Sequence, residues 1–479
     1  MNLDVRIVST FPPRRCGIAT FARHTANALS HFTDQVGRIR VAAIDTDGLS
    51  YHLPVDLVID QYDPESWRRA GVQIIERARE ARNPTAVLLQ HEFGLDPAAD
   101  GTRARGLNMP RLAGMFSRAG LPTFAYLHSV VMDPTRHQKR VVQELGRRCD
   151  ALFVTTNSAV HILESDAYGV PRAKVKHVDH GVRMRNPSRH DRVEAKEKHG
   201  IAGTFLVTSL GMRSPRKGLE YGIRAYGRFL DESCAPAQRK RFLYLIAGTC
   251  HPQFVKLNGG RPHTEYETGL LTALESSGVS WTWADSLKDV DLSRHELVLV
   301  DDFLDEEALL DFYVASDAVL LPYPNVQQIS SGVLADTVGT GRVAIATKFL
   351  YAQELINPQS VEHRGIVLGN RARGILVDPG EPSVEQIAQA LDLLAFHPQE
   401  RASMERRAHE RGHLMRWQNS AWQLIRHMQF SHEKHTMRNA EPIELERRTG
   451  SRYRERNRWL LNHGGRDRSG RPASIQAGQ

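Results

Sequence analysis

The sequence has 479 residues, of which 41% are hydrophobic and 25% are charged. At about 150 residues per domain, this length predicts two or three domains with sizeable cores, and the balance excludes a fibrous or wholly disordered chain. The four cysteines (Cys16, Cys149, Cys234 and Cys250) are scattered without a CxxC pair. That spacing excludes a disulfide framework or a zinc site and is typical of a reducing compartment.

The ends of the chain carry no membrane signal. The first residues lack a basic stretch followed by an apolar one, and no apolar run approaches the roughly 20 residues of a membrane span. We therefore expect a cytoplasmic protein. The net charge of +8 is concentrated at the end, since residues 431–479 hold 11 lysines and arginines against 6 acidic residues. Such a tail can touch the acidic inner face of a membrane, although a solvated tail is the simpler interpretation, and no specific nucleic acid is expected.

Short apolar runs rich in β-branched residues recur along the chain and predict buried strands. In the first half they are 5–10, 39–44, 86–90, 123–128, 151–156 and 174–178. In the second half they are 205–210, 242–247, 297–303, 318–321, 343–347 and 374–377. Helical patterns lie between many of them, as in Ile18, Phe21, Thr25, Ala28 and Phe32.

Strands that alternate with helices indicate parallel sheets covered on both faces. The apolar pattern breaks near 183–192, so the sequence predicts an α/β fold of two doubly wound, Rossmann-like domains, over 1–185 and 186–412. A further helical segment covers 401–430, with Trp417, Trp422, Ile425 and Phe430 expected to be buried. A basic tail, partly disordered, is expected over 431–479. Because ligands of open α/β sheets bind beyond the carboxyl ends of the strands, the motifs that follow strands matter most.

The most informative motif follows the strand at 318–321. A polar loop leads to Ser330-Ser331-Gly332-Val333, which is a helix start, and the short helix ends before Gly341. The first N–H groups of a helix lack internal partners and the helix dipole adds about half a positive charge, so this is an anion site. Gln328 and Asp336 lie eight residues apart beside it, and a phosphate flanked by sugar hydroxyls would fit. An ordinary helix cap is the alternative interpretation.

Two further loops after strands are glycine-rich or basic. The first runs from Thr10 to Phe21 and holds Arg14, Arg15 and Gly17, and its glycine lets the backbone approach a ligand closely. The second, 209–218, holds Arg213, Lys217 and Gly218. Fixed cations at such a point stabilise negative charge that develops on a departing group. Solvent-facing basic turns are the alternative for both loops.

Histidines end several predicted strands. His91 and Glu92 end the third, His128 the fourth and His180 the sixth, so all four face the same expected cleft. A capped loop residue is the alternative interpretation for each histidine. Asp45-Thr-Asp47 has the DxD form that binds Mn²⁺ or Mg²⁺ in GT-A glycosyltransferases, but such spacing arises often by chance. A GT-A fold would also leave the second set of strands unexplained. We therefore expect no metal site.

The order of these motifs resembles the retaining glycosyltransferases of family 4, which have the GT-B fold. Their Glu-x7-Glu signature falls on Gln328 and Asp336, followed by Gly341 and the strand at 343–347. Neither glutamate is present, but both replacements accept hydrogen bonds. Their Gly-Arg-x4-Lys-Gly motif matches at Gly211, Lys217 and Gly218, with methionine at the arginine position and Arg213 one place later.

The resemblance assigns roles to the motifs. It implies that Lys217, Arg213 and His128 serve catalysis, and that Gly17, Gln328, Ser330, Ser331, Gly332, Val333 and Asp336 bind the donor. Within that set, Gln328 and His128 would contact the donor sugar and Asp336 the ribose. On the acceptor side it implies His91, Glu92, Arg14 and Arg15. The first domain would then be the acceptor side and the second the donor side, with a helix at 413–430 crossing back to the first domain.

The function implied is transfer of a sugar from a nucleoside diphosphate to an acceptor hydroxyl, with retention of configuration and with neither metal nor cofactor. The partners implied are a nucleotide sugar and a sugar, glycan or lipid-linked acceptor. Loss of both glutamates leaves a non-catalytic GT-B binding protein open, and another nucleotide-sugar enzyme such as an epimerase is a second alternative.

Overall fold

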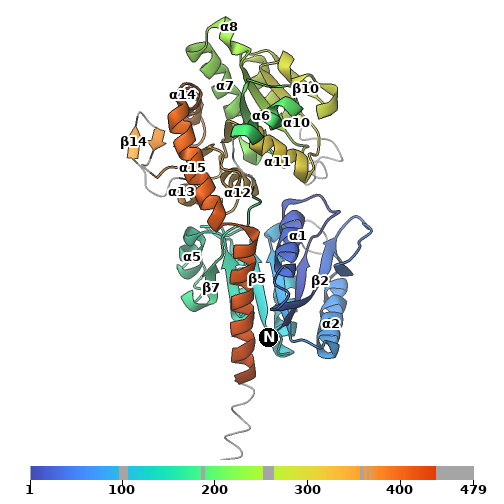
Figure 1. Cartoon of the computed structure of the whole chain (residues 1–479). Coiled ribbons are helices and arrows are strands. Elements are labelled where there is room, and N and C mark those ends of the chain that lie inside the picture. The colour runs from blue at the N-terminus through green and yellow to red at the C-terminus, as the bar shows by residue number, and fades with distance from the viewer. Residues whose placement is uncertain are drawn as a thin grey trace, which may run out of the picture.

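The computed structural model describes residues 2–96, 106–184, 189–251, 264–356, 361–363, 366–368 and 371–437. Figure 1 shows two layered units, each a sheet with helices on its faces, and the chain begins in the lower one. The two doubly wound domains predicted from the apolar runs are therefore present. The tail predicted over 431–479 lies almost wholly outside the described residues.

The first sheet is parallel, with strand order β3-β2-β1-β4-β5-β6-β7. Its strands are β1 (Leu3–Ser9), β2 (Val36–Asp45), β3 (Val55–Asp60), β4 (Thr85–His91), β5 (Thr123–Leu127), β6 (Ala151–Val154) and β7 (Val175–His177). Its helices are α1 (Gly17–Ser30), α2 (Pro64–Glu80), α3 (Asn108–Arg118), α4 (Arg136–Arg148) and α5 (Asn157–Glu164).

The second sheet has the order β10-β11-β9-β8-β12-β13-β16-β15-β14, and only its last two pairings are antiparallel. Its strands are β8 (Phe205–Leu210), β9 (Phe242–Ala247), β10 (Trp281–Ala284), β11 (Leu297–Val300), β12 (Ala318–Leu321), β13 (Ala344–Thr347), β14 (Val361–His363), β15 (Ile366–Leu368) and β16 (Gly374–Val377). Its helices are α6 (Arg189–Lys198), α7 (Leu219–Ser233), α8 (Pro236–Arg239), α10 (Thr264–Glu275), α11 (Glu306–Ala315), α12 (Gly332–Gly339), α13 (Leu350–Leu355), α14 (Pro382–Phe396) and α15 (Pro398–Leu414).

Every apolar run predicted as a strand overlaps a strand of the structure. The prediction missed β3 and β10, which lie at outer edges of the two sheets, and the short β14 and β15. The side chains of β3 alternate between buried and partly or fully exposed, and those of β10 are all half-buried. Edge strands carry a weaker apolar signal because one side of the strand lacks a neighbour.

A final helix, over 417–437, leaves the second unit and runs down beside the first sheet, as Figure 1 shows. Its buried stripe has helical spacing and joins the core of the first sheet through Ala421, Leu424, Ile425 and Met428. Two of the four buried positions predicted here are wrong. Trp422 is 45% exposed and Phe430 is 67% exposed, because both fall off that stripe.

The chain therefore crosses between the domains twice, and the two crossings lie side by side. Val182 N donates to Met415 O at 2.8 Å, and Val182 forms an isolated parallel bridge with Arg416. Gly181 lies so close to Trp417 that a Cβ there would meet the indole at 2.2 Å. Only glycine fits at this point without displacing the ring.

A second contact between the domains lies at α5 and α13. Glu354 of α13 accepts hydrogen bonds from Asn157 N at 2.8 Å and Ser158 N at 2.6 Å. A carboxylate from the second domain thus caps the amino terminus of a helix in the first, where unpaired N–H groups and the helix dipole favour negative charge. Nearby, Thr155 Oγ1 donates to Ile329 O at 2.7 Å.

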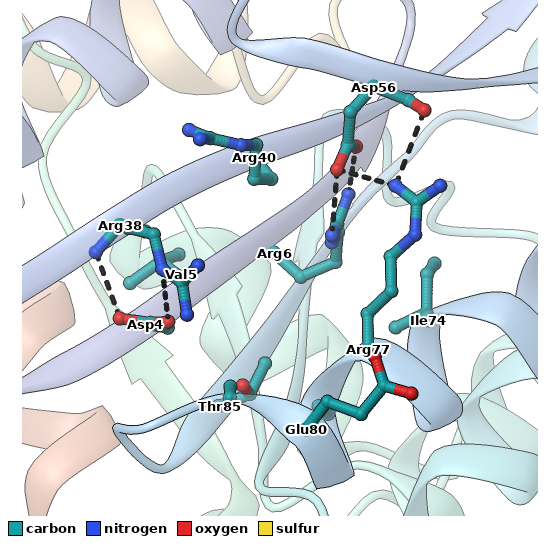
Figure 2. Close-up of a pocket in the computed structure, with 12 residues that line it drawn as sticks. Asp4, Val5, Arg6, Arg38, Arg40, Asp56, Ile74, Arg77, Glu80 and Thr85 are labelled. Carbon is teal, nitrogen blue, oxygen red and sulfur yellow. Dashed lines mark hydrogen bonds and ion pairs between the residues drawn. The ribbon is translucent and has the colours of Figure 1, made fainter.

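Buried charge at the amino edge of the first sheet is neutralised within the domain. Arg6 of β1 is 6% exposed and pairs with Asp56, which Arg77 also contacts, as Figure 2 shows. Arg38 pairs with Asp4 through Arg38 Nε and Asp4 Oδ2, 3.2 Å apart. Burial lowers the pKa of Arg6, and the Asp56 carboxylate opposes that shift.

No helix in the described part of the chain is both long enough and apolar enough to span a membrane.

We predict that Leu424→Ala destabilises the protein by about 2–5 kcal/mol, because Leu424 is 2% exposed and its truncation leaves a cavity under the final helix. Urea unfolding followed by tryptophan fluorescence measures the change. Phe430→Ala is the matched control on the same helix, and its effect should stay within about 0.5 kcal/mol because Phe430 is largely exposed. Equal losses in both variants would contradict the docking of this helix.

Candidate functional site

A cavity of about 560 Å³ lies between the two domains. The first domain contributes the loop after β1, the start of α1, and His180 after β7. The second contributes the residues that follow β8, β9 and β11 and the starts of α11 and α12. All of these segments follow the carboxyl ends of parallel strands, which is where ligands of open α/β sheets bind.

The start of α12 forms part of the cavity wall. Ser331 caps the helix, and its Oγ accepts from Leu334 N at 3.2 Å. Gly332 and Val333 follow and line the cavity, whereas Ser330 precedes the cap. The helix start predicted over 330–333 is therefore present, and its unpaired N–H groups face a space large enough for an anion.

Lys217 lies beside this helix start at the end of the 3-10 turn Pro215–Lys217. Its Nζ donates to the hydroxyl of Tyr323 at 2.7 Å and lies 4.5 Å from the centre of that ring. A small space next to the cavity is lined by Lys217 together with Gly211 and Val333, which also line the main cavity. Lys217 is half-buried, and it lines the same small space as Val333 of the helix start.

The turn that carries Lys217 depends on the glycine after it. Gly218 has φ +58°, in the left-handed region, and a Cβ there would lie 2.2 Å from Pro322 O. Glycine is therefore required both by conformation and by space. This close approach places the turn directly against the loop that leads from β12 to α12.

Arg213 points elsewhere. Its side chain is 1% exposed, its Nε donates to Gly248 O at 2.7 Å, and its Nη2 lies 2.6 Å from Asp301 Oδ2. It is not among the residues that line the cavity, and Met212 faces the cavity in its place. The catalytic role predicted for Arg213 stays a prediction, and the contacts observed are those of a residue that positions the loop.

Asp336 and Gln328 do not lie on one helix face. Asp336 is on α12 and lines the cavity, whereas Gln328 lies in the loop before the helix and donates from Nε2 to Ser330 O at 2.8 Å. Burial raises the pKa of Asp336 to about 6, although the positive charge of Arg183 opposes the shift. At neutral pH the Asp336 carboxylate is ionised and faces the cavity.

The predicted loop of the first domain also faces the cavity through Arg14, Arg15 and Gly17. Arg14 Nη1 donates to Ile44 O at 3.0 Å, which holds the loop against β2. The Arg15 guanidinium lies 4.8 Å from the ring centre of Phe303 in the second domain. Space around Gly17 is open, with no atom within 4 Å of a Cβ placed there.

The strand-end histidines gather behind this loop. His128 Nε2 and Gln90 Oε1 are 2.7 Å apart, and the rings of His128 and His180 lie 4.7 Å and 5.1 Å from Phe21. Burial lowers the pKa of His128 to about 3 and that of His180 to about 4, so both rings are neutral at physiological pH. Of these two histidines, His180 lines the cavity directly.

His91 and Glu92 differ in their access to the cleft. His91 is fully buried, its pKa is lowered to about 4 by burial, and neither ring nitrogen has a hydrogen-bond partner in the described structure. Glu92 accepts from Ser129 Oγ at 3.3 Å. Burial raises the pKa of Glu92, and the positive charge of Arg216, from the second domain, lowers it.

The sequence prediction missed an ion-pair cluster at the cavity, centred on Glu306 at the start of α11. Glu306 pairs with Arg23, with His24 Nε2 at 3.3 Å and with Arg183 Nη1 at 3.5 Å. Burial acts to raise the pKa of Glu306, but the hydrogen bond with His24 and the charges of Arg23 and Arg183 lower it to about 2. The available signal was Asp305-Glu306-Glu307, a capped helix start after a strand.

Asp45 of the DxD sequence serves its own loop. It is 4% exposed, and its carboxylate accepts from Leu49 N at 2.9 Å and from the hydroxyl of Tyr51 at 3.2 Å. These hydrogen bonds explain why an acidic residue stands at the end of β2, because its carboxylate caps the loop that follows.

Comparison with solved structures finds the same two-domain architecture in several proteins. HepE from Anabaena, solved with UDP, aligns with a TM-score of 0.61 at 16% identity over 88% of this chain and 98% of that one. Sucrose-phosphate synthase from Thermosynechococcus elongatus aligns with a TM-score of 0.61 at 14% identity, over 88% and 97%. Trehalose-6-phosphate synthase from Burkholderia multivorans aligns with a TM-score of 0.59 at 13% identity, over 91% and 98%.

At these identities the likeness establishes the fold, so the predicted GT-B architecture is confirmed. No protein-family model matches the sequence, and the search of curated proteins found no match.

We predict that the Glu306 cluster stabilises the folded state in a pH-dependent way. Its folded pKa of about 2 lies below the ordinary 4.5, so its contribution is fully present above about pH 4.5 and is lost as the pH falls towards 2. Because the Glu306 side chain is 26% exposed, solvent screens the pairs and the contribution should be about 1 kcal/mol.

Urea unfolding of wild type and Glu306→Gln between pH 3 and pH 7 measures this contribution. The difference in free energy of unfolding should be constant near neutral pH and shrink in acid. Glu410→Gln, at an exposed position on α15, is the control and should match wild type throughout. A Glu306→Gln difference that does not change with pH would contradict the prediction.

Proposed function

We propose that the protein is a glycosyltransferase of the family 4 type, which moves a sugar from a nucleoside diphosphate to an acceptor hydroxyl with retention of configuration. The observation that carries the proposal is the arrangement around one cavity of the α12 helix start, the neighbouring Lys217 and the ionised Asp336. These groups match the needs of a diphosphate joined to a ribose. The solved structures of HepE with UDP and with UDP-glucose support a nucleotide-sugar partner by analogy of fold.

The diphosphate would lie against Gly332 and Val333, with the Lys217 ammonium on its flank. The helix N–H groups are fixed donors, and Lys217 is held in place by Tyr323. Such preorganised groups stabilise the charge that grows on the departing diphosphate without having to rearrange. In this proposal Arg213 supports the loop from inside.

The ribose would be held by Asp336, since an ionised carboxylate can accept hydrogen bonds from two neighbouring hydroxyls. The sugar would lie towards the neutral histidines, with His180 at the cavity wall and His128 behind it against the same phenylalanine. Gln328 Oε1 is the remaining candidate for a sugar contact, from the loop before α12.

The acceptor would enter from the first domain, beside Arg14 and Arg15, and the backbone at Gly17 on the same loop would approach the donor. Glu92 is a further polar contact on that side. His91 is fully buried, so it would act on the acceptor only by holding the end of β4 in place. The acceptor is proposed to be a sugar, glycan or lipid-linked hydroxyl.

The proposed reaction breaks the bond between the anomeric carbon and the diphosphate oxygen and forms a bond from the acceptor oxygen on the same face. The acceptor proton passes to the departing phosphate oxygen. No second catalytic carboxylate is needed, in contrast to glycosidases, which require a pair. Neither a metal nor a cofactor takes part in this scheme.

Incubation of the protein with a panel of nucleotide sugars and candidate acceptors tests the proposal. Free nucleoside diphosphate together with a glycosylated product supports a transferase. An isomerised donor would instead identify an epimerase, and binding without turnover would identify a non-catalytic protein.

We predict that Lys217→Ala lowers the rate of transfer by ten- to 150-fold with the fold intact. Loss of one charge-assisted hydrogen bond costs about 1.5–3 kcal/mol, and each 1.4 kcal/mol is a factor of about ten. Steady-state kinetics measure the loss, and Lys288→Ala, an exposed lysine in the same domain, is the control. Wild-type rates in Lys217→Ala would show that Lys217 does not stabilise the departing diphosphate.

We predict that donor affinity rises with pH through about 6, where Asp336 ionises in the free protein. A nucleotide sugar is the right probe because its diphosphate is a diester and lacks the ionisation near pH 6 of a phosphate monoester. Calorimetry between pH 5 and 7.5 should show this rise in wild type and its absence in Asp336→Asn.

The same calorimetric measurement on Gln328→Ala tests the proposed contact with the sugar. It should weaken the intact nucleotide sugar but leave the free nucleoside diphosphate nearly unchanged, because the latter has no sugar. Equal weakening of both ligands would show that Gln328 does not contact the sugar. A pH dependence that persists in Asp336→Asn would reject the ribose contact.

We predict that turnover survives EDTA. Lys217 and the α12 helix start provide the positive charge that a metal would otherwise provide, and the Asp45 carboxylate is engaged by its own loop. The assay compares initial rates before and after chelation. Activity that disappears in EDTA and returns with Mn²⁺ would instead favour the DxD interpretation.

A further inference from the structure

A second cavity, of about 750 Å³, lies at the opposite edge of the second sheet. It is lined by the residues just before or at the start of β8, β9 and β12 and by parts of α6, α14 and α15. These are the amino ends of the strands, whereas the cavity between the domains lies beyond their carboxyl ends. The six residues of β8 span about 20 Å, so the two cavities are separate.

One wall of this cavity is cationic. Asp317 is 3% exposed and is contacted by Lys196 Nζ, by Arg192 Nη1 at 3.3 Å and by Arg401 Nη2 at 3.8 Å. A single carboxylate thus faces three cations. Glu405 is the second carboxylate of the lining and pairs with Arg192.

Arg241 adds a fourth cation to the lining. It is exposed and lies directly before β9, and its guanidinium has no ion pair with the described residues. The lining therefore holds four positive groups against two negative ones.

A fifth cation lies behind this wall. Arg342 is fully buried, and its Nε, Nη1 and Nη2 all lack a hydrogen-bond partner in the described structure. Burial and the charge of Arg192 lower its pKa to about 9, while Glu405, Asp317 and Asp191 oppose the shift. Arg342 is thus charged at neutral pH, and two of the carboxylates near it, Asp317 and Glu405, already pair with other cations.

The other wall is apolar and aromatic. Phe205, Phe242 and Phe396 line it, and Phe396 is 45% exposed although it lies 6.1 Å from the ring of Phe242. Arg401 joins the two walls, because its guanidinium lies 5.2 Å from the ring centre of Phe205. A ligand here would meet positive charge on one side and exposed ring surface on the other.

A third cavity, lined by arginines in the first domain, differs from this one in its charge balance. There Arg6 and Arg77 share Asp56, Arg38 pairs with Asp4, and Glu80 also lines the space, as Figure 2 shows. Three carboxylates among the lining residues face four arginines, a surplus of one positive charge, and none of these arginines is buried without a partner. Of these two cavities, the one in the second domain has the larger surplus of positive charge among its described residues, and it also has an exposed aromatic wall.

We propose that the cavity formed by Arg192, Lys196, Arg241, Arg401 and the phenylalanine wall binds a small phosphate ester whose organic part is aromatic or apolar. The phosphate would take up the surplus positive charge, and the organic part would cover Phe396. This is a ligand site apart from the cavity between the domains, and it does not depend on the function proposed for that cavity.

Phenyl phosphate is the probe, because it joins the two chemistries in the smallest molecule. Calorimetry with the full chain should detect binding of phenyl phosphate, about tenfold weaker binding of inorganic phosphate, and no binding of phenol. Arg241→Glu should weaken phenyl phosphate at least about tenfold, whereas Arg241→Lys should bind nearly as wild type. Arg241 is exposed, so the fold should persist, and circular dichroism checks this.

Two controls separate this site from other sources of binding. Lys288→Glu makes the same change of charge at an exposed position of the same domain and should bind as wild type. Lys217→Ala removes the cation of the anion site between the domains, so the phenyl phosphate binding that Arg241→Glu weakens should persist in Lys217→Ala. Loss of binding in Lys217→Ala, equal binding by wild type and Arg241→Glu, or no binding of phenyl phosphate at millimolar concentration would each overturn the proposal.

Discussion

The two neighbouring crossings of the chain between domains are the constraint on which the cleft depends. Val182 and Met415 are joined by a backbone hydrogen bond, and Gly181 and Trp417 are packed without room for a Cβ. The same indole lies 5.0 Å from Phe21 and stacks on His24 at 5.3 Å. One aromatic side chain, Trp417, therefore contacts both the crossing at Gly181 and the first helix of the cleft, α1.

Within that frame, charge is distributed unevenly around the cavity. The second domain offers a helix amino terminus, Lys217, the Asp336 carboxylate, and Glu306, which is paired with cations of the first domain. The first offers neutral imidazoles, whose pKa values burial keeps at about 4 or below, and the charges of two arginines on one loop. A ligand with a negative centre and a neutral, hydroxyl-rich end fits this division, with the negative end towards the second domain.

The fold could be read from the sequence because buried parallel strands are continuous apolar runs, and the central strands of both sheets are of that kind. The helix start at Ser331 was also predictable, since a capping serine before glycine is a local signal. The edge strands β3 and β10 were missed because their burial is partial.

Contacts between distant segments were not predictable from local pattern. Glu306 of the second domain pairs with three residues of the first: Arg23, His24 and Arg183. The spacing of these residues along the sequence does not predict the pairs. Arg213 turns inward because Asp301, 88 positions later, accepts its charge. Trp422 and Phe430 looked like core residues by type, but the register of the helix turns them to solvent.

The hydrogen bonds from α5 to Glu354 mean that a helix of the first domain is capped by a side chain of the second. The first N–H groups of α5 find their acceptor on a helix nearly 200 residues later. A fragment that ended at the domain boundary would contain every residue of α5 and still leave those N–H groups unpaired. The first domain therefore needs Glu354 of the second domain to complete its backbone hydrogen bonds, although its sheet is complete without it.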